Sequence, residues 1–308
     1  MQSKTSKTKQ KSNLAQQKPQ HEWSFEAIGT HWWVGVYQPL ASQRLTEVKQ
    51  LVAARIEQFD AVYSRFRDDS LVSDIARATG TYTFPQDGEL LFETYRQLYD
   101  LTNGAVTPLI GQALSDAGYD TDYSLRPSDI TAPPKWDDVM TYHKGVLTTS
   151  QPVLLDFGAA GKGYLVDIVA SLLHDHGIGQ YCIDAGGDMV SRGLGVALRI
   201  GLEDPADSSR AVGVVDLHDM ALCGSAGNRR SWGIYHHILD PSSLRSPQHV
   251  SALWVTAESV RTADGIATAL FFVEPEALQK AFTFEYLILY ANSRVACSTA
   301  FPGDTFSE

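Results

Sequence analysis

Apolar residues recur at helical spacing in several parts of the chain. Leu45, Val48, Val52, Ile56 and Phe59 lie on one face of a predicted helix over residues 44–63. A short helix is expected within residues 64–78. A further amphipathic helix begins at residue 88 and ends at the Asn103-Gly104 pair, which is typical of a helix C-terminus.

Other segments have the alternation and composition of strands. The aromatic stretch over residues 21–37 predicts a first strand, residues 152–158 predict an apolar strand, and residues 159–177 predict the helix that follows it. Residues 118–150 are rich in turns. Residues 180–193 predict a strand and a tight turn, and more strands with turns follow over 195–257. A helix from residue 262 and paired strands over 285–299 complete the pattern. Because strands and helices come in mixed order with hairpin-like spacing, we predict an α+β fold with mostly antiparallel sheets and packed helices.

Composition separates the first 22 residues from the rest. They carry five lysines, one glutamate and many Gln and Ser residues, so we expect a disordered tail over residues 1–22 and a single domain over 23–308. Without the tail, 20 basic and 35 acidic residues remain, which gives a net charge of −15. Such an acidic body argues against nucleic acid as a partner. No apolar run is long enough for a membrane span, no signal peptide is evident, and the three cysteines have no metal-ligand spacing; a cytoplasmic location is expected.

The glycine-rich segment 156–164 is the first candidate for chemistry. It carries an apolar stretch through small residues into a helix, and free backbone N–H groups at a helix N-terminus bind phosphate. It is not a P-loop, because Asp156 and Gly163 occupy positions that require Gly and Ser or Thr, and it does not fit the dinucleotide fingerprint. The same residues also suit an ordinary strand-to-helix turn.

Two further groups could take part in a reaction. Asp264 and Thr268 are four residues apart, so on a helix they share a face and offer hard oxygen ligands suited to Mg²⁺. Helix capping by Thr262, with Asp264 near the positive end of the helix dipole, is the alternative. His236 and His237 precede an Asp-Pro turn, and only one of the two adjacent imidazoles can face a site as a general base. Residues 184–188 read as a hairpin turn or as a close approach to a ligand.

Taken in order, these segments resemble motifs of the FAD:protein FMN transferase (ApbE) family. The family's D-L-G-x-x-A-K-G-Y-x-x-D resembles residues 156–167, its N-x-G-G-D residues 184–188, and its S-G-x-x-R residues 225–229. Its H-I-x-D-P resembles residues 237–241 and its A-D-x-x-x-T-A residues 263–269. Weaker similarities lie at residues 28–30, 64–66 and 104–108.

The resemblance implies a T-fold-like catalytic domain that binds FAD with Mg²⁺ and transfers FMN to a Thr or Ser hydroxyl of an acceptor flavoprotein, releasing AMP. It also implies roles for individual residues. His237 would be the catalytic base, and Ala159, Asp264 and Thr268 the Mg²⁺ ligands. FAD would contact Ile28, Phe66, Ala105, Val106, Thr107, Asp156, Lys162 and Ile238. An FAD diphosphatase and a non-catalytic FAD-binding protein are the alternatives.

Overall fold

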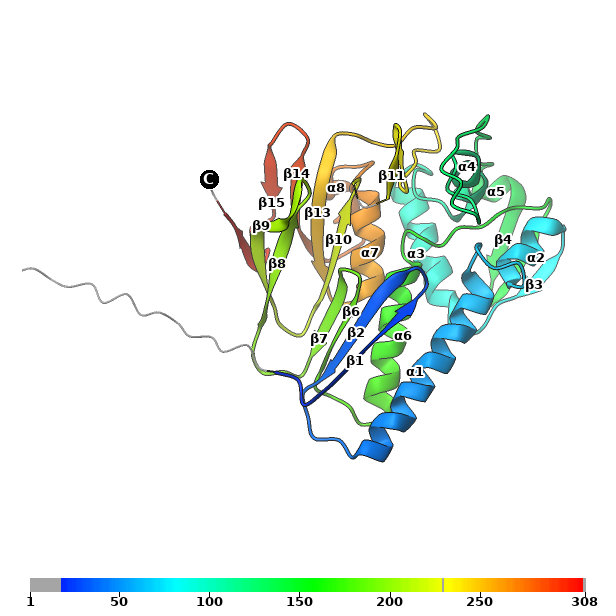
Figure 1. Cartoon of the computed structure of the whole chain (residues 1–308). Helices are drawn as coiled ribbons and strands as arrows, with labels where there is room; N and C mark the ends of the chain where they lie inside the picture. The colour runs from blue at the N-terminus through cyan, green and yellow to red at the C-terminus, as the bar shows by residue number, and fades with distance from the viewer. Residues whose placement is uncertain (1–17, 229, 307–308) are drawn as a thin grey trace, which may run out of the picture.

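A large antiparallel sheet forms the centre of the computed structural model, which describes residues 18–228 and 230–306 (Figure 1). Its eight strands have the order β1-β2-β6-β7-β10-β13-β14-β15. They are β1 (His21–Ala27), β2 (Thr30–Val36), β6 (Tyr181–Ala185), β7 (Asp188–Arg192), β10 (Ala221–Ala226), β13 (Val250–Ala257), β14 (Phe284–Tyr290) and β15 (Val295–Cys297). Every pairing in this sheet is antiparallel, as the sequence predicted.

The N-terminal aromatic stretch forms two strands, and the prediction of one strand was wrong. Ile28 and Gly29 have φ angles of 45° and 72° and form a tight turn that pairs Ala27 with Thr30. The β1–β2 hairpin exists because two left-handed residues reverse the chain. Strand β1 begins at His21, so the last two residues of the predicted tail belong to the sheet, and residues 1–17 lie outside the described part of the chain.

Helices cover one face of the sheet (Figure 1). They include α1 (Ser42–Tyr63), α3 (Gly88–Leu101), α6 (Gly161–Asp175) and α7 (Val260–Ala269). Of the apolar positions predicted for α1, Val48, Val52, Ile56 and Phe59 are buried in the main core, which confirms the helical pattern.

A second, smaller sheet covers the other face. It consists of β16 (Gly303–Thr305), β9 (Asp207–Leu217) and β8 (Leu198–Asp204) in that order. Val215, Leu217 and Leu202 from this sheet pack on Trp254 and Leu222 of the large one. The large sheet therefore lies between a helical layer and a β layer.

The remaining elements gather at one end of the helical layer. They are the β3 (Thr81–Thr83), β5 (Val146–Thr149) and β4 (Met140–His143) sheet, the β11 (Ser231–Trp232) and β12 (Tyr235–His236) hairpin, helices α2 (Leu71–Arg77), α4 (Gly111–Asp116), α5 (Trp136–Val139) and α8 (Pro275–Leu278), and the 3-10 helix η1 (Pro108–Ile110). No helix in the described residues is both long and apolar enough to cross a membrane.

The predicted strand over residues 152–158 is not present. This stretch is extended, but its backbone bonds go to helices: the Val153 N–H donates to the Ile75 carbonyl of α2, and the Asp156 N–H donates to the Pro108 carbonyl of η1 at 2.7 Å. An apolar stretch with turn residues on both sides is buried here without a strand partner. Its position still delivers Asp156 and the following glycines to the start of α6.

Helices α6 and α7 cap one another. The Asp167 carboxylate of α6 accepts the Val260 and Arg261 N–H groups of α7, both at 2.9 Å, while the Asp264 carboxylate of α7 accepts the Gly163 N–H of α6 at 2.8 Å. A carboxylate near a helix N-terminus is favoured by the helix dipole. The N-cap residue of α7 is Ser259, and the expectation that Thr262 caps this helix was wrong.

Candidate active site

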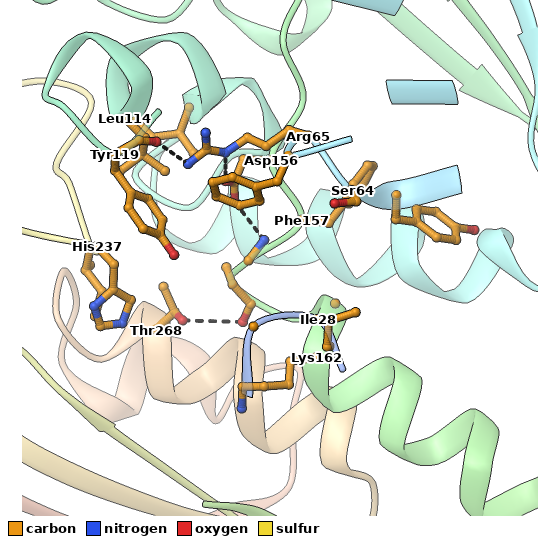
Figure 2. A pocket seen from close by; sticks show the side chains of 18 of the residues that line it. Ile28, Ser64, Arg65, Leu114, Tyr119, Asp156, Phe157, Lys162, His237 and Thr268 are labelled. Atoms are coloured by element: carbon orange, nitrogen blue, oxygen red, sulfur yellow. Dashed lines mark hydrogen bonds and ion pairs between the residues drawn. The ribbon is translucent and has the colours of Figure 1, made fainter. Parts of the chain in front are cut away.

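One cavity of about 390 Å³ lies where the β1–β2 turn, the segment after α3, the start of α6 and the end of α7 meet (Figure 2). Eleven of the twelve predicted site residues line it, although they are scattered along the chain. They are Ile28, Phe66, Ala105, Val106, Thr107, Asp156, Ala159, Lys162, His237, Ile238 and Thr268. The twelfth, Asp264, is buried one helical turn before Thr268 on α7.

Two of the three predicted metal ligands, Ala159 and Thr268, meet at one corner of this cavity, and the third, Asp264, is buried one helical turn before Thr268. The Thr268 hydroxyl donates to the Ala159 carbonyl at 3.3 Å, across 109 positions of sequence (Figure 2). Asp264 is 8% exposed and uses one carboxylate oxygen for the Gly163 N–H. Burial raises the pKa of the Asp264 carboxyl, whereas the Lys162 ammonium and the Gly163 N–H lower it.

The charges around this corner leave a negative balance. Lys162 makes an ion pair with Asp188, which is buried, and its charge also acts on Asp264. With both carboxyl groups ionised, two carboxylates against one ammonium give a local charge of −1, and a buried uncompensated charge is costly, so the pKa of Asp264 is raised. A hydroxyl, a carbonyl and a carboxylate oxygen form a hard donor set for Mg²⁺, which keeps few protein ligands. The residues fit a magnesium ion. This donor set is the candidate metal site, because the described chain contains no cluster of three or more His, Cys, Asp or Glu side chains that could hold a metal.

The start of α6 differs from the open phosphate site that the sequence suggested. The Gly161 N–H donates to the Phe157 carbonyl, the Gly163 N–H to Asp264, and the Gly158 N–H to the Asp156 carboxylate. The Ala159 N–H donates to the Tyr95 hydroxyl at 3.0 Å. Most of the expected free donors are therefore already paired. The one basic side chain of segment 156–164, Lys162, is also paired, with Asp188, and is one quarter exposed.

The two adjacent histidines have different surroundings, and only His237 lines the cavity, although it lies just after strand β12 and not within it. The His236 ring bonds with the Pro247 carbonyl at 2.8 Å and accepts the Ile238 N–H, so it holds the loop together. His237 lines the cavity, and its ring Nδ1 is buried without a hydrogen-bond partner.

Burial is also the main influence on the ionisation of His237. Together with the positive charge of Arg230, it lowers the pKa of His237 to about 3. The imidazole is neutral at pH 7 and has an unused ring nitrogen, as a general base requires. An anionic substrate beside Arg230 and Lys162 would offset the positive charges of these side chains and so raise the pKa of His237, which would make His237 a stronger base.

An aromatic wall lines the same cavity as Ala159 and Thr268, and only part of it was predicted. Phe66 stacks on Tyr123 with ring centres 5.4 Å apart, and the Arg65 guanidinium lies 4.2 Å from the centre of the Phe66 ring. Arg65 is 4% exposed; its Nε donates to the Asp156 carboxylate at 2.5 Å and its terminal nitrogen to the Tyr119 carbonyl at 2.7 Å. This wall of flat groups suits the stacking of a planar ring.

Sequence reasoning missed Tyr119, Tyr123 and Arg230 as site residues. Arg230 donates to the Tyr119 hydroxyl at 2.8 Å and to the Gly29 carbonyl at 3.3 Å, so it links three segments at the cavity. Its neighbour Arg229, which matched the predicted motif, lies outside the described residues. The only sequence signal for Arg230 was its position beside that motif. Tyr119 and Tyr123 lie in a turn-rich stretch without a motif, and only the fold brings them to the site.

Most of the chain is similar to known proteins. The family model described as the ApbE family matches residues 28–286. A protein of Escherichia coli K12 named FAD:protein FMN transferase is 23% identical over 289 residues, with 86% of this chain and 82% of that protein covered. A protein of the same name from Vibrio cholerae is 28% identical over 251 residues, covering 75% and 73%.

Solved structures match the whole fold. The flavin transferase ApbE from Vibrio cholerae superposes with a TM-score of 0.77 at 24% identity, covering 91% of this chain and 97% of that one. The ApbE protein from Thermotoga maritima gives the same TM-score at 20% identity, with the same coverage. These similarities confirm the predicted mixture of helices and antiparallel sheet.

Proposed function

The chain belongs to the ApbE family, and on this premise we propose that it transfers FMN from FAD to a Thr or Ser hydroxyl of an acceptor flavoprotein and releases AMP. Relatives that match along three quarters or more of this chain are named FAD:protein FMN transferases. One observation in the structure carries the proposal. A single cavity is lined by Ala159 and Thr268, which lie one helical turn from the buried Asp264 carboxylate, by the neutral imidazole of His237 and by the aromatic ring of Phe66.

Two surfaces of the cavity bind different parts of FAD, its planar ring system and its diphosphate. The stacked ring of Phe66, together with Ile28 and Val106, supports a planar ring system of FAD. Lys162 lies beside the metal corner, where its ammonium attracts the diphosphate. When bound, Mg²⁺ would neutralise charge that develops on the phosphate oxygens. Ala159, Asp264 and Thr268 would hold it through their oxygens.

His237 accounts for the proton in the transfer step. The acceptor hydroxyl oxygen attacks the phosphorus of the FMN half and forms a phosphoester bond, while the unpaired ring nitrogen of His237 takes the hydroxyl proton. The bond from that phosphorus to the bridging oxygen breaks, and AMP leaves with the electron pair. Lys162 and Arg230 offset negative charge on this side of the cavity, and the remaining barrier is lowered by positioning.

A two-arm incubation tests the function. The protein is mixed with FAD and Mg²⁺, with or without a candidate flavoprotein, and AMP is measured over time. The proposal expects AMP release that depends on the acceptor. Release at the same rate without acceptor would identify an FAD diphosphatase, and absence of release in both arms, while FAD still binds, would identify a non-catalytic FAD-binding protein.

A further inference from the structure

Asp188 is a buried charge that the proposed reaction does not use. It is the first residue of β7, directly after the Gly186-Gly187 turn, and it is 1% exposed. Its carboxylate makes an ion pair with Lys162 of α6. A carboxylate this deeply buried needs a countercharge, and Lys162 supplies it.

The ammonium of Lys162 pairs with Asp188, and its charge also influences a second acid. Its charge acts on the Asp264 carboxyl from α7 as well as on Asp188, and it also reaches His237 across the cavity. The Lys162 side chain is one quarter exposed, so it can move toward the cavity, whereas Asp188 and Asp264 are fixed in the core. Lys162 is therefore a cation that Asp188 holds near the Asp264 carboxylate, the proposed metal ligand.

We propose that Asp188 is a positioning residue: by holding Lys162 it sets how strongly the Asp264 corner binds a divalent cation, without coordinating that ion. The inference rests on the metal site of the proposed function. With Asp188 ionised, the corner carries a charge of −1 and Lys162 has a second partner. With Asp188 neutral, the local charge is zero and Lys162 competes with the metal for Asp264.

Asp188→Asn and the double variant Asp188→Asn/Lys162→Met separate this role from a structural one. Asp188→Asn leaves Lys162, whose side chain is one quarter exposed, without its carboxylate partner and should weaken binding of a divalent cation about tenfold, a difference of about 1.4 kcal/mol. The double variant removes the competing ammonium and restores a local charge of −1, so its affinity should return to within about threefold of the starting protein. A residue that only supports the fold would not be rescued by removing Lys162.

The matched control lies in the same turn. Asp184 is at the other end of the hairpin, is half-buried and accepts the Gly187 N–H at 2.8 Å. Asp184→Asn keeps an oxygen for this bond and should leave the affinity unchanged, because Asp184 does not pair with Lys162.

The experiment measures Mn²⁺ binding by electron paramagnetic resonance of the free ion, without FAD, on the full chain, with circular dichroism as the check of folding. Weaker binding by Asp188→Asn and recovery in the double variant support the inference. Unchanged binding by Asp188→Asn, or equal weakening in both variants, overturns it. Failure of the starting protein to bind Mn²⁺ overturns the metal assignment too. Acceptor-dependent AMP release by that protein, measured separately, tests the transfer activity independently of these variants.

Discussion

Replacement of Asp264 is the most informative perturbation of the proposed metal site, because this carboxylate would have two roles. It is the only acidic ligand proposed for Mg²⁺, and it also accepts the Gly163 N–H at 2.8 Å to cap α6. Asp264→Ala removes both functions. Asp264→Asn removes the charge and keeps an oxygen that can accept the same N–H.

The structure gives different magnitudes for the two variants. Asp264→Ala leaves the buried Gly163 N–H without a partner, which lowers the free energy of unfolding by about 1–3 kcal/mol. Part of this loss is offset because the variant no longer has to bury a carboxylate. Asp264→Asn should therefore change the free energy of unfolding by less than about 1 kcal/mol. In the unsubstituted protein, Mg²⁺ at about 100 times its dissociation constant should add about 2.7 kcal/mol of stability. Neither variant should show this gain.

The assay combines urea unfolding with and without Mg²⁺ and the rate of AMP release. Both variants should lose at least about 100-fold in Mg²⁺-dependent turnover, which corresponds to about 2.7 kcal/mol of barrier. Asp167→Asn is the control, because Asp167 caps α7 in the same way but lies away from the cavity. It should lose stability and keep its response to Mg²⁺. Undiminished turnover by Asp264→Asn would refute the metal assignment.

Three further changes test other parts of the account. Because the pKa of His237 is lowered to about 3 in the folded protein, the unfolded chain binds a proton more readily below pH 6.5; the free energy of unfolding should fall by up to about 1.4 kcal/mol per pH unit between pH 6.5 and 3. His237→Gln should flatten this profile in urea titrations and reduce transfer about 100-fold or more; an unchanged slope would contradict the burial argument. Gly163→Ala would place a Cβ 2.5 Å from the Val260 carbonyl oxygen and should cost about 3 kcal/mol in thermal unfolding, whereas Gly179→Ala, with its nearest atom at 4.0 Å, should change little. Ile28→Asn places Asn-Gly at a left-handed turn and should raise stability by about 1 kcal/mol while weakening FAD binding in fluorescence titrations; a stability loss would rule out strain at this turn.

Local patterns in the sequence predicted the helices well and the extended segments less well. The burial of Val48, Val52 and Ile56 follows from a period of 3.6 residues, which is a local property. The stretch 152–158 has the apolar composition of a strand, but a strand also needs a partner with free backbone groups. That partner is set by the whole fold, and here carbonyl groups of α2 and η1 bind the stretch instead.

Most of the residues that the sequence singled out line one cavity, but the contacts among them could not be predicted. Asp264 and Thr268 were recognised by their spacing, and the structure places Thr268 against Ala159 as the resemblance implied. The bond from Gly163 to Asp264 spans 101 positions, and no local pattern encodes it. The same holds for Arg65, whose burial against Asp156 appears only when α1 and the start of α6 meet.

The intact mass of an acceptor flavoprotein tests the central claim most directly. The purified acceptor is incubated with FAD, Mg²⁺ and this protein, and its mass is measured together with the AMP formed. The account predicts an acceptor that gains one FMN through a phosphoester on a Thr or Ser side chain, with one AMP released for each FMN attached. AMP release with an acceptor of unchanged mass would contradict it.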